Sequence, residues 1–145
     1  MKKDTSFGIV PIILSERGLP RFLLIHQTVG HWAFPKGHPE ENETPIESAR
    51  RELMEETGVS NIRMLDGYSY IQNYLFEKEG EQIEKTVTFF AGFVEDEKVV
   101  VNKDEVQDFE WLCYQDALER LTYEDSKQLV KDVYARLRTE GLLKV

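Results

Sequence analysis

The sequence predicts an α/β fold in which helices flank a mixed β-sheet. Apolar runs of strand length alternate with amphipathic segments of helical period, and a polar turn joins two of the strands. The chain has 145 residues, of which 41% are hydrophobic, and this suits one globular domain with one core. We therefore expect a single domain that spans residues 1–145.

The expected elements follow one another along the chain in this order. Apolar or alternating runs predict strands at residues 6–14, 21–27, 63–76, 85–94 and 109–113. The polar segment 77–84 is expected to be the turn between the third and fourth of these strands. Helical sequence is expected at residues 45–57, 114–121 and 123–137, and in the last segment Leu129, Val130, Val133, Tyr134 and Leu137 recur at helical spacing.

The helix expected at Pro45–Thr57 has clear end signals. Thr44, Pro45 and Glu47 suit the N-cap, first and third helical positions of a capping box. Gly58 suits the left-handed residue that follows the last turn. Both ends of this helix are therefore set by local chemistry.

One face of this helix is apolar and the adjacent face is acidic. The arc expected to face the core contains Ile46, Ala49, Leu53 and Thr57, and the neighbouring arc contains Glu52, Glu55 and Glu56. Carboxylates at i,i+4 spacing destabilise a helix by about 0.2 to 0.5 kcal/mol, so a positive partner is expected between them. Arg51 can pair with Glu55, whereas a hard divalent cation relieves the repulsion on the other side. A solvated acidic face is the alternative interpretation.

Charge and composition exclude several classes of protein. The net charge is −9, which opposes binding to duplex nucleic acid or to anionic lipid. The apolar run 7–14 is too short for a membrane span, and we interpret it as a buried strand instead of a signal peptide. Cys113 is the only cysteine, so the chain can form no internal disulfide. We expect a cytoplasmic monomer.

A spaced motif surrounds the acidic helix. It runs Gly37-x5-Glu43-x7-Arg51-Glu52-Leu53-x-Glu55-Glu56-x-Gly58-Val59. At every fixed position this resembles the Nudix box of the Nudix hydrolase superfamily. The resemblance implies an α/β/α sandwich that uses Mg²⁺ or Mn²⁺ to hydrolyse a phosphate anhydride in a nucleotide. It also implies that Glu52, Glu55 and Glu56 bind the metal, and that Arg51 and Glu43 orient these ligands.

Further segments resemble the asymmetrical diadenosine tetraphosphate hydrolases of that superfamily. They are the stretch 31–38, Asn73-Tyr74, Lys85-Thr86-Val87, and Glu105 before Trp111-Leu112. The resemblance implies a dinucleoside polyphosphate substrate, with His31, Lys36, His38 and Lys85 contacting its phosphates and Tyr74 stacking on an adenine. The acidic character of segment 77–84 departs from the more basic loop expected of such relatives, and this weakens the case for phosphate contacts there.

Each of these residues also has an ordinary structural interpretation. The two histidines could be loop residues, Lys36 and Lys85 could be surface or packing residues, and Tyr74 shares its strand parity with Tyr68 and Tyr70. Glu105 is the expected general base for attack of water on phosphorus, although it could belong to a plain polar turn. Glu55 is the rival base, and Arg51 supports the reacting groups.

The sequence alone leaves three other functions open. The chain could be a Nudix enzyme that acts on RNA 5′ ends or on nucleoside triphosphates. It could be a nucleotide-sensing module without turnover, although the intact Arg51-Glu52 and Glu55-Glu56 pairs disfavour that. A purely structural interaction domain is the remaining alternative.

Overall fold

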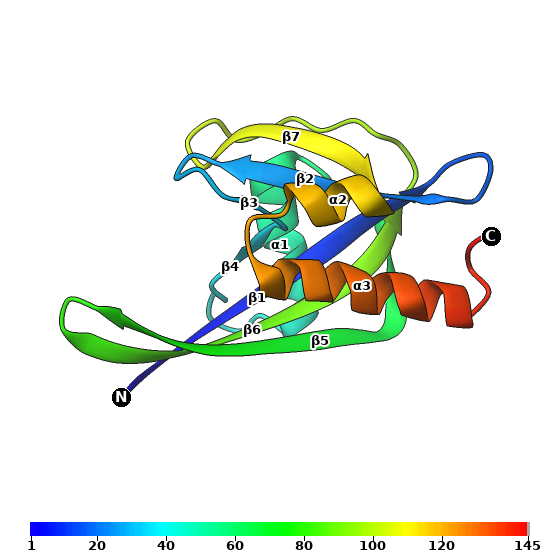
Figure 1. Cartoon of the computed structure of the whole chain (residues 1–145). Coiled ribbons are helices and arrows are strands. Elements are labelled where there is room, and N and C mark those ends of the chain that lie inside the picture. The colour runs from blue at the N-terminus through cyan, green and yellow to red at the C-terminus, as the bar shows by residue number, and fades with distance from the viewer. Residues whose placement is uncertain (145) are drawn as a thin grey trace.

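The computed structural model describes residues 1–144, and it has seven strands in one mixed sheet with helices on both faces (Figure 1). The strands are β1 (Lys2–Leu14), β2 (Pro20–Gln27), β3 (Trp32–Ala33), β4 (Lys36–Gly37), β5 (Ile62–Lys78), β6 (Glu81–Val94) and β7 (Val106–Cys113). The helices are α1 (Pro45–Thr57), α2 (Tyr114–Arg120) and α3 (Glu124–Thr139). The predicted α/β class with a mixed, helix-flanked sheet is confirmed.

The sheet is built around β1. Its strand order is β3-β2-β1-β6-β5, with β4 also paired to β1 and β7 to β2. The pairing of β1 with β6 is parallel, and every other pairing in the sheet is antiparallel. Because successive side chains of a strand point to opposite faces, β1 serves two cores. Val10 and Ile12 pack with α2 and α3, whereas Ile9 and Ile13 pack with α1.

The β5–β6 hairpin is longer than the sequence indicated. The expected turn at 77–84 is wrong, because the two strands continue to Lys78 and resume at Glu81. Glu79 and Gly80 form the turn with φ angles of 54° and 77°, the positive values that a type I′ hairpin turn requires. The charged side chains of segment 77–84 give no alternating pattern, so the sequence did not indicate strands there. The two strands nevertheless stay hydrogen-bonded to each other in this solvent-exposed part. The hairpin therefore projects beyond the helices (Figure 1).

Other boundaries also differ from the predicted ones. Strand β1 begins at Lys2 instead of residue 6, and β7 begins at Val106 instead of residue 109. The short strands β3 and β4 were not predicted, because two residues carry no periodic signal. Helix α3 has the expected apolar stripe, in which Leu129, Val130, Val133 and Leu137 are buried.

Helix α1 begins and ends where its sequence predicts. The Thr44 side chain accepts from the Glu47 amide, the Glu47 carboxylate accepts from the Thr44 amide, and Gly58 closes the helix at φ 73°. Ala49, Leu53 and Thr57 are buried, as expected. The prediction for Ile46 is wrong, since its side chain is 41% exposed. The packed cluster under α1 includes Ala49 and Leu53 and does not extend to the first turn.

Within residues 1–144, no helix is both long and apolar enough to cross a membrane.

Leu53→Ala should destabilise the fold, because Leu53 is fully buried between α1 and the sheet. We expect the free energy of unfolding to fall by about 3 kcal/mol, from lost burial and a residual cavity. Met54→Ala is the matched control, since Met54 is the next residue along α1 and is 53% exposed. It should change stability by less than about 0.5 kcal/mol. Urea denaturation measures both, and equal losses would contradict the packing described.

Candidate active site

One guanidinium group ties the loop before α1 to the carboxylates of α1. Arg51 Nε donates to Glu43 Oε2 at 2.6 Å, and Arg51 Nη1 donates to Glu52 Oε1 at 3.0 Å and Glu55 Oε2 at 3.1 Å. Arg51 Nη2 donates to the His38 carbonyl at 2.9 Å. The hydrogen bond from Arg51 is the main reason that the pKa of Glu43 lies below its ordinary value. Arg51 therefore fixes the orientation of two helix carboxylates.

Glu52 lies against the backbone of β4. A side chain at Gly37 would overlap the Glu52 carboxyl group, so Glu52 would have to leave its present position. The Glu52 side chain is 13% exposed, and burial is the largest cause that raises its pKa, opposed by the ion pair with Arg51. The glycine of the motif therefore has a steric role beside the acidic helix face.

Glu56 is the most buried carboxylate of the group, at 5% exposed. Its Oε2 atom has no hydrogen-bond partner among the residues that the structure describes. Burial, followed by the charges of Glu52 and Glu105, raises the pKa of Glu56 to about 9. A buried carboxyl group without a partner is costly, so it must either hold a proton or meet a cation.

The donor set of this region fits a hard divalent cation. Carboxylate oxygens are the ligands that Mg²⁺ and Mn²⁺ prefer, and Glu56 Oε2 is a buried oxygen without a partner in residues 1–144. In the described part of the chain, however, no three acidic, histidine or cysteine side chains are already gathered as a ligand cluster. Glu52 and Glu55 contact Arg51 instead. Assigning all three glutamates as metal ligands stays a prediction, and it requires Glu55 to turn away from Arg51.

Glu105 lies on the loop between β6 and β7, and backbone hydrogen bonds fix this loop beside α1. The Asn102 amide donates to the Glu56 carbonyl at 3.1 Å, and the Thr28 amide donates to the Glu105 carbonyl at 3.0 Å. The Glu105 carboxylate is exposed, yet it lies close enough to raise the pKa of Glu56. The structure thus brings Glu105 to the acidic helix from a distant part of the chain.

A cavity of about 370 Å³ gathers three of the predicted substrate-binding residues, His31, Lys36 and Tyr74. Phe34, Phe89 and Tyr123 also line it. His31 Nε2 lies 2.9 Å from the Tyr123 hydroxyl group, at the start of α3. Burial, and then the charge of Lys85, lowers the pKa of Lys36. Tyr123 was missed by the sequence analysis, because nothing local marks an aromatic residue before a helix as part of a site.

Lys85 and His38 lie outside that cavity and share one carboxylate. Lys85 Nζ donates to Asp4 Oδ2 at 2.9 Å and to Ser6 Oγ at 2.6 Å, and His38 Nε2 lies 2.8 Å from Asp4 Oδ1. Burial would raise the pKa of Asp4, but the neighbouring Lys85 and His38 lower it below its ordinary value. Asp4 was also missed by the sequence analysis, since only the parallel register of β1 with β6 brings it to Lys85.

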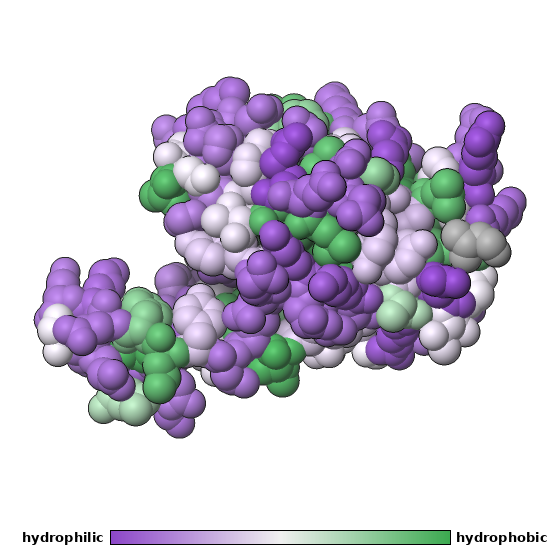
Figure 2. All heavy atoms as spheres, in the orientation of Figure 1, coloured by the Kyte–Doolittle hydropathy of each residue, from purple (hydrophilic) through white to green (hydrophobic). Residues whose placement is uncertain are grey.

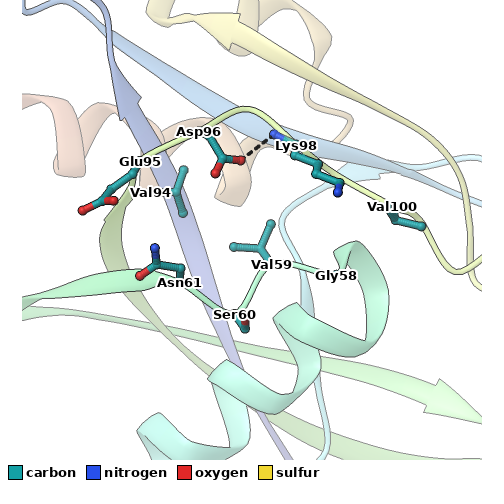
Figure 3. A pocket seen from close by; sticks show the side chains of 9 residues that line it. All are labelled: Gly58, Val59, Ser60, Asn61, Val94, Glu95, Asp96, Lys98 and Val100. Atoms are coloured by element: carbon teal, nitrogen blue, oxygen red, sulfur yellow. Dashed lines mark hydrogen bonds between the residues drawn. The ribbon is translucent and has the colours of Figure 1, made fainter.

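A further cavity of about 220 Å³ lies past the end of α1 and is lined by residues 58–61 and by the segment after β6 (Figure 3). The Lys98 amide donates to Asp96 Oδ1 at 2.9 Å across its rim. None of the predicted site residues is among the described residues that line it. The candidate active site is therefore the acidic face of α1 with the aromatic cavity near Lys36.

Comparisons with known proteins show what this chain is similar to. The model of a family described as the NUDIX domain matches residues 2–133. The rat bis(5′-nucleosyl)-tetraphosphatase [asymmetrical] is 33% identical over 116 residues, covering 77% of this chain and 76% of the relative. An RNA pyrophosphohydrolase of Helicobacter pylori is 30% identical over 125 residues, covering 79% and 78%. A solved structure of a C. elegans Ap4A hydrolase binary complex matches with a TM-score of 0.81 at 23% identity, covering 94% of this chain and 98% of that one.

Glu56→Gln should stabilise the metal-free protein in a pH-dependent way. The raised pKa means that folded Glu56 stays protonated between about pH 4.5 and 9, whereas the unfolded chain ionises there. Folding stability attributable to Glu56 is therefore present at low pH and is lost as pH rises toward 9. Glutamine mimics the protonated form, so the Tm gain of the variant should be near zero at pH 4.5 and grow up to pH 9.

Thermal unfolding in the presence of a chelator measures this effect. Glu41→Gln is the control, because Glu41 precedes α1 and is exposed. A Tm difference between Glu56→Gln and the natural protein that does not change with pH would contradict the raised pKa.

Proposed function

The chain belongs to the NUDIX domain family and is a Nudix hydrolase, and from this premise we propose that it cleaves diadenosine tetraphosphate asymmetrically into ATP and AMP. The observation that carries the proposal is the aromatic cavity with Tyr74 and Tyr123 on its walls and the half-buried Lys36 at its edge, beside the acidic helix. The asymmetrical tetraphosphatases of rat and pig support it, at 33% and 31% identity.

The cavity suits a nucleobase next to phosphate. Aromatic side chains give a stacking surface worth about 1 to 3 kcal/mol per base, and Tyr74 is 39% exposed, so its ring is available to a ligand. Lys36 supplies a compact cation at the same cavity, and His31 supplies a ring that Tyr123 already holds. We propose that an adenine enters between Tyr74 and Tyr123, with its phosphates toward Lys36.

Nudix hydrolases generally use divalent metal ions. We propose that Mg²⁺ or Mn²⁺ is held by Glu52, Glu55 and Glu56. An ion bound there would neutralise phosphate charge and act as a Lewis acid. Arg51 positions two of these proposed metal ligands, because it donates hydrogen bonds to the Glu52 and Glu55 carboxylates. Glu43 in turn holds Arg51 through a hydrogen bond of 2.6 Å. The low pKa of Glu43 keeps that anchor ionised.

The reaction itself is attack of water on phosphorus, for which the chain must supply a base. Glu105 is the proposed base, because it is exposed to solvent and lies close enough to Glu56 to affect its pKa. Glu55 is the rival, although its carboxylate accepts two hydrogen bonds from Arg51. Both oxygens of Glu55 are held by Arg51, whereas the Glu105 carboxylate is exposed to water, and this favours Glu105.

RNA 5′ ends are the second candidate substrate class. The observation that favours them is the 30% identity to an RNA pyrophosphohydrolase over 79% of this chain. The net charge of −9 disfavours a polyanionic strand, which would need a local basic groove. Nucleoside triphosphates remain a third class, and a nucleotide-sensing role without turnover is disfavoured by family membership.

Product analysis tests the proposed reaction. The purified protein with diadenosine tetraphosphate and Mg²⁺ in ¹⁸O-labelled water should give ATP and AMP, with the label in one product and no turnover after chelation. Mass spectrometry identifies both the products and the labelled phosphate. Release of pyrophosphate from triphosphorylated RNA, with diadenosine tetraphosphate left intact, would reject the proposal in favour of the second class.

Glu105→Gln should slow the chemical step more than it weakens substrate binding. We expect kcat to fall by about 10²-fold or more with KM little changed, because the amide cannot take a proton from water. Asp104→Asn is the matched control, since Asp104 is the exposed neighbour in the same loop. Steady-state kinetics separates the two parameters. A rise in KM at unchanged kcat would move the base role to Glu55.

A further inference from the structure

A third cavity, the hairpin cavity, lies on the projecting β5–β6 hairpin. Its volume is about 340 Å³, and it is bounded by the ends of β1, β5 and β6 and by His38. Phe76 and Ile83 form its apolar part, and Phe76 is half-buried there. Apolar side chains gather on the hairpin where it extends beyond the main body (Figure 2). A hollow lined by an aromatic ring thus lies away from the helices.

Three consecutive residues, 36–38, lead from one cavity to the other. Lys36 lines the aromatic cavity, and His38 lines the hairpin cavity. Gly37 lies between them and faces the Glu52 carboxyl group. Residues in extended strands are about 3.3 Å apart, so Lys36 and His38 are separated by about 7 Å along the chain. The acidic helix face therefore lies beside the segment that leads from one cavity to the other.

The same sheet face connects the cavities. Gln72 and Tyr74 line the aromatic cavity, whereas Phe76 and Lys78 line the hairpin cavity. These alternate residues of β5 point to one face, and the Tyr74 and Phe76 ring centroids are 6.1 Å apart. From Gln72 to Lys78 the strand spans about 20 Å. Lys85 lies across from Tyr74 on β6, in the middle of this face. The face thus carries two neighbouring aromatic rings on β5, with a lysine across from one of them.

We propose that the hairpin cavity binds the second nucleoside of a two-ended substrate, with Phe76 as its stacking surface. This inference rests on the proposed function, and it deepens that function by giving the enzyme a preference for a dinucleotide over a nucleotide with one base. The first nucleoside occupies the aromatic cavity. The phosphate chain passes Lys36 and His38 beside the carboxylates of α1.

The charges around the hairpin cavity favour a nucleoside over a terminal phosphate. The charges of Lys2 and Lys78 are matched there by the carboxylates of Glu79 and Glu81. The Asp4 carboxylate is already paired with Lys85. Such a balance does not attract a polyanionic end. Carboxylates accept hydrogen bonds from ribose hydroxyl groups and from an exocyclic amine, and the Phe76 ring can stack on any base. A neutral, hydrogen-bonding end group is therefore the better fit.

Phe76→Ala with two substrates tests the second site. Diadenosine tetraphosphate carries two bases, whereas adenosine 5′-tetraphosphate carries one base and the same number of phosphates. Phe76→Ala should lower kcat/KM for the dinucleotide by about tenfold and leave that for the mononucleotide unchanged. Tyr74→Ala should lower both. Leu75→Ala is the matched control, because Leu75 is 59% exposed on the opposite face of β5, and it should change neither.

The outcomes separate this inference from the proposed function. Equal effects of Phe76→Ala on both substrates, or no effect on either, in variants with an unchanged Tm, would overturn the second site while the reaction stands. If the natural protein hydrolyses neither compound, the proposed reaction fails. The second site is then judged by calorimetry with Mg²⁺ present. Tighter binding of the dinucleotide that Phe76→Ala removes would support it, and equal affinity for the two compounds would overturn it.

Discussion

Repulsion among the carboxylates of α1 is the constraint on which the arrangement of the candidate site depends. Three glutamates crowd one side of a helix whose other side is buried, so water cannot screen them freely. Two features of the structure reduce this repulsion. Arg51 binds Glu52 and Glu55, whereas Glu56 keeps a strongly raised pKa and a buried oxygen without a partner in residues 1–144. An arrangement that is costly for stability is therefore maintained where a cation can relieve it.

Strand β1 connects this acidic face to the binding surfaces. Ile9 and Ile13 pack in the core beneath α1, and the other face of the strand carries Asp4 and Ser6, which hold Lys85. Gly8 has no side chain, and this allows Pro35 and the Lys36 side chain to approach β1 closely. The position of Lys36 relative to the acidic helix thus depends on sheet packing as much as on the motif itself.

The two lysines of the site lie in different electrostatic surroundings. Lys85 is nearly fully buried, and Asp4 stabilises its charge at 2.9 Å. Lys36 has a lowered pKa, because it is partly removed from water and lies near a second lysine. For a phosphate chain that reaches these residues, Lys85 is already paired with a carboxylate, whereas an anion would stabilise the charge of Lys36. Lys36 is therefore the stronger candidate for phosphate binding, and Lys85 acts with Asp4 as one unit.

The sequence by itself determined the class of fold, the boundaries of α1 and the residues of its acidic face. Those features follow from periodicity, capping and spacing within about twenty residues, and Thr44, Arg51 and Gly58 contact neighbours in that range. Only the tertiary structure decided which distant groups meet there. The contacts of Asp4 with Lys85 and of Tyr123 with His31 join residues 81 and 92 positions apart. Strand register and the packing of α3 set such contacts, and neither leaves a local signal. The length of the hairpin was likewise hidden, because its charged residues look like a turn until the strands pair.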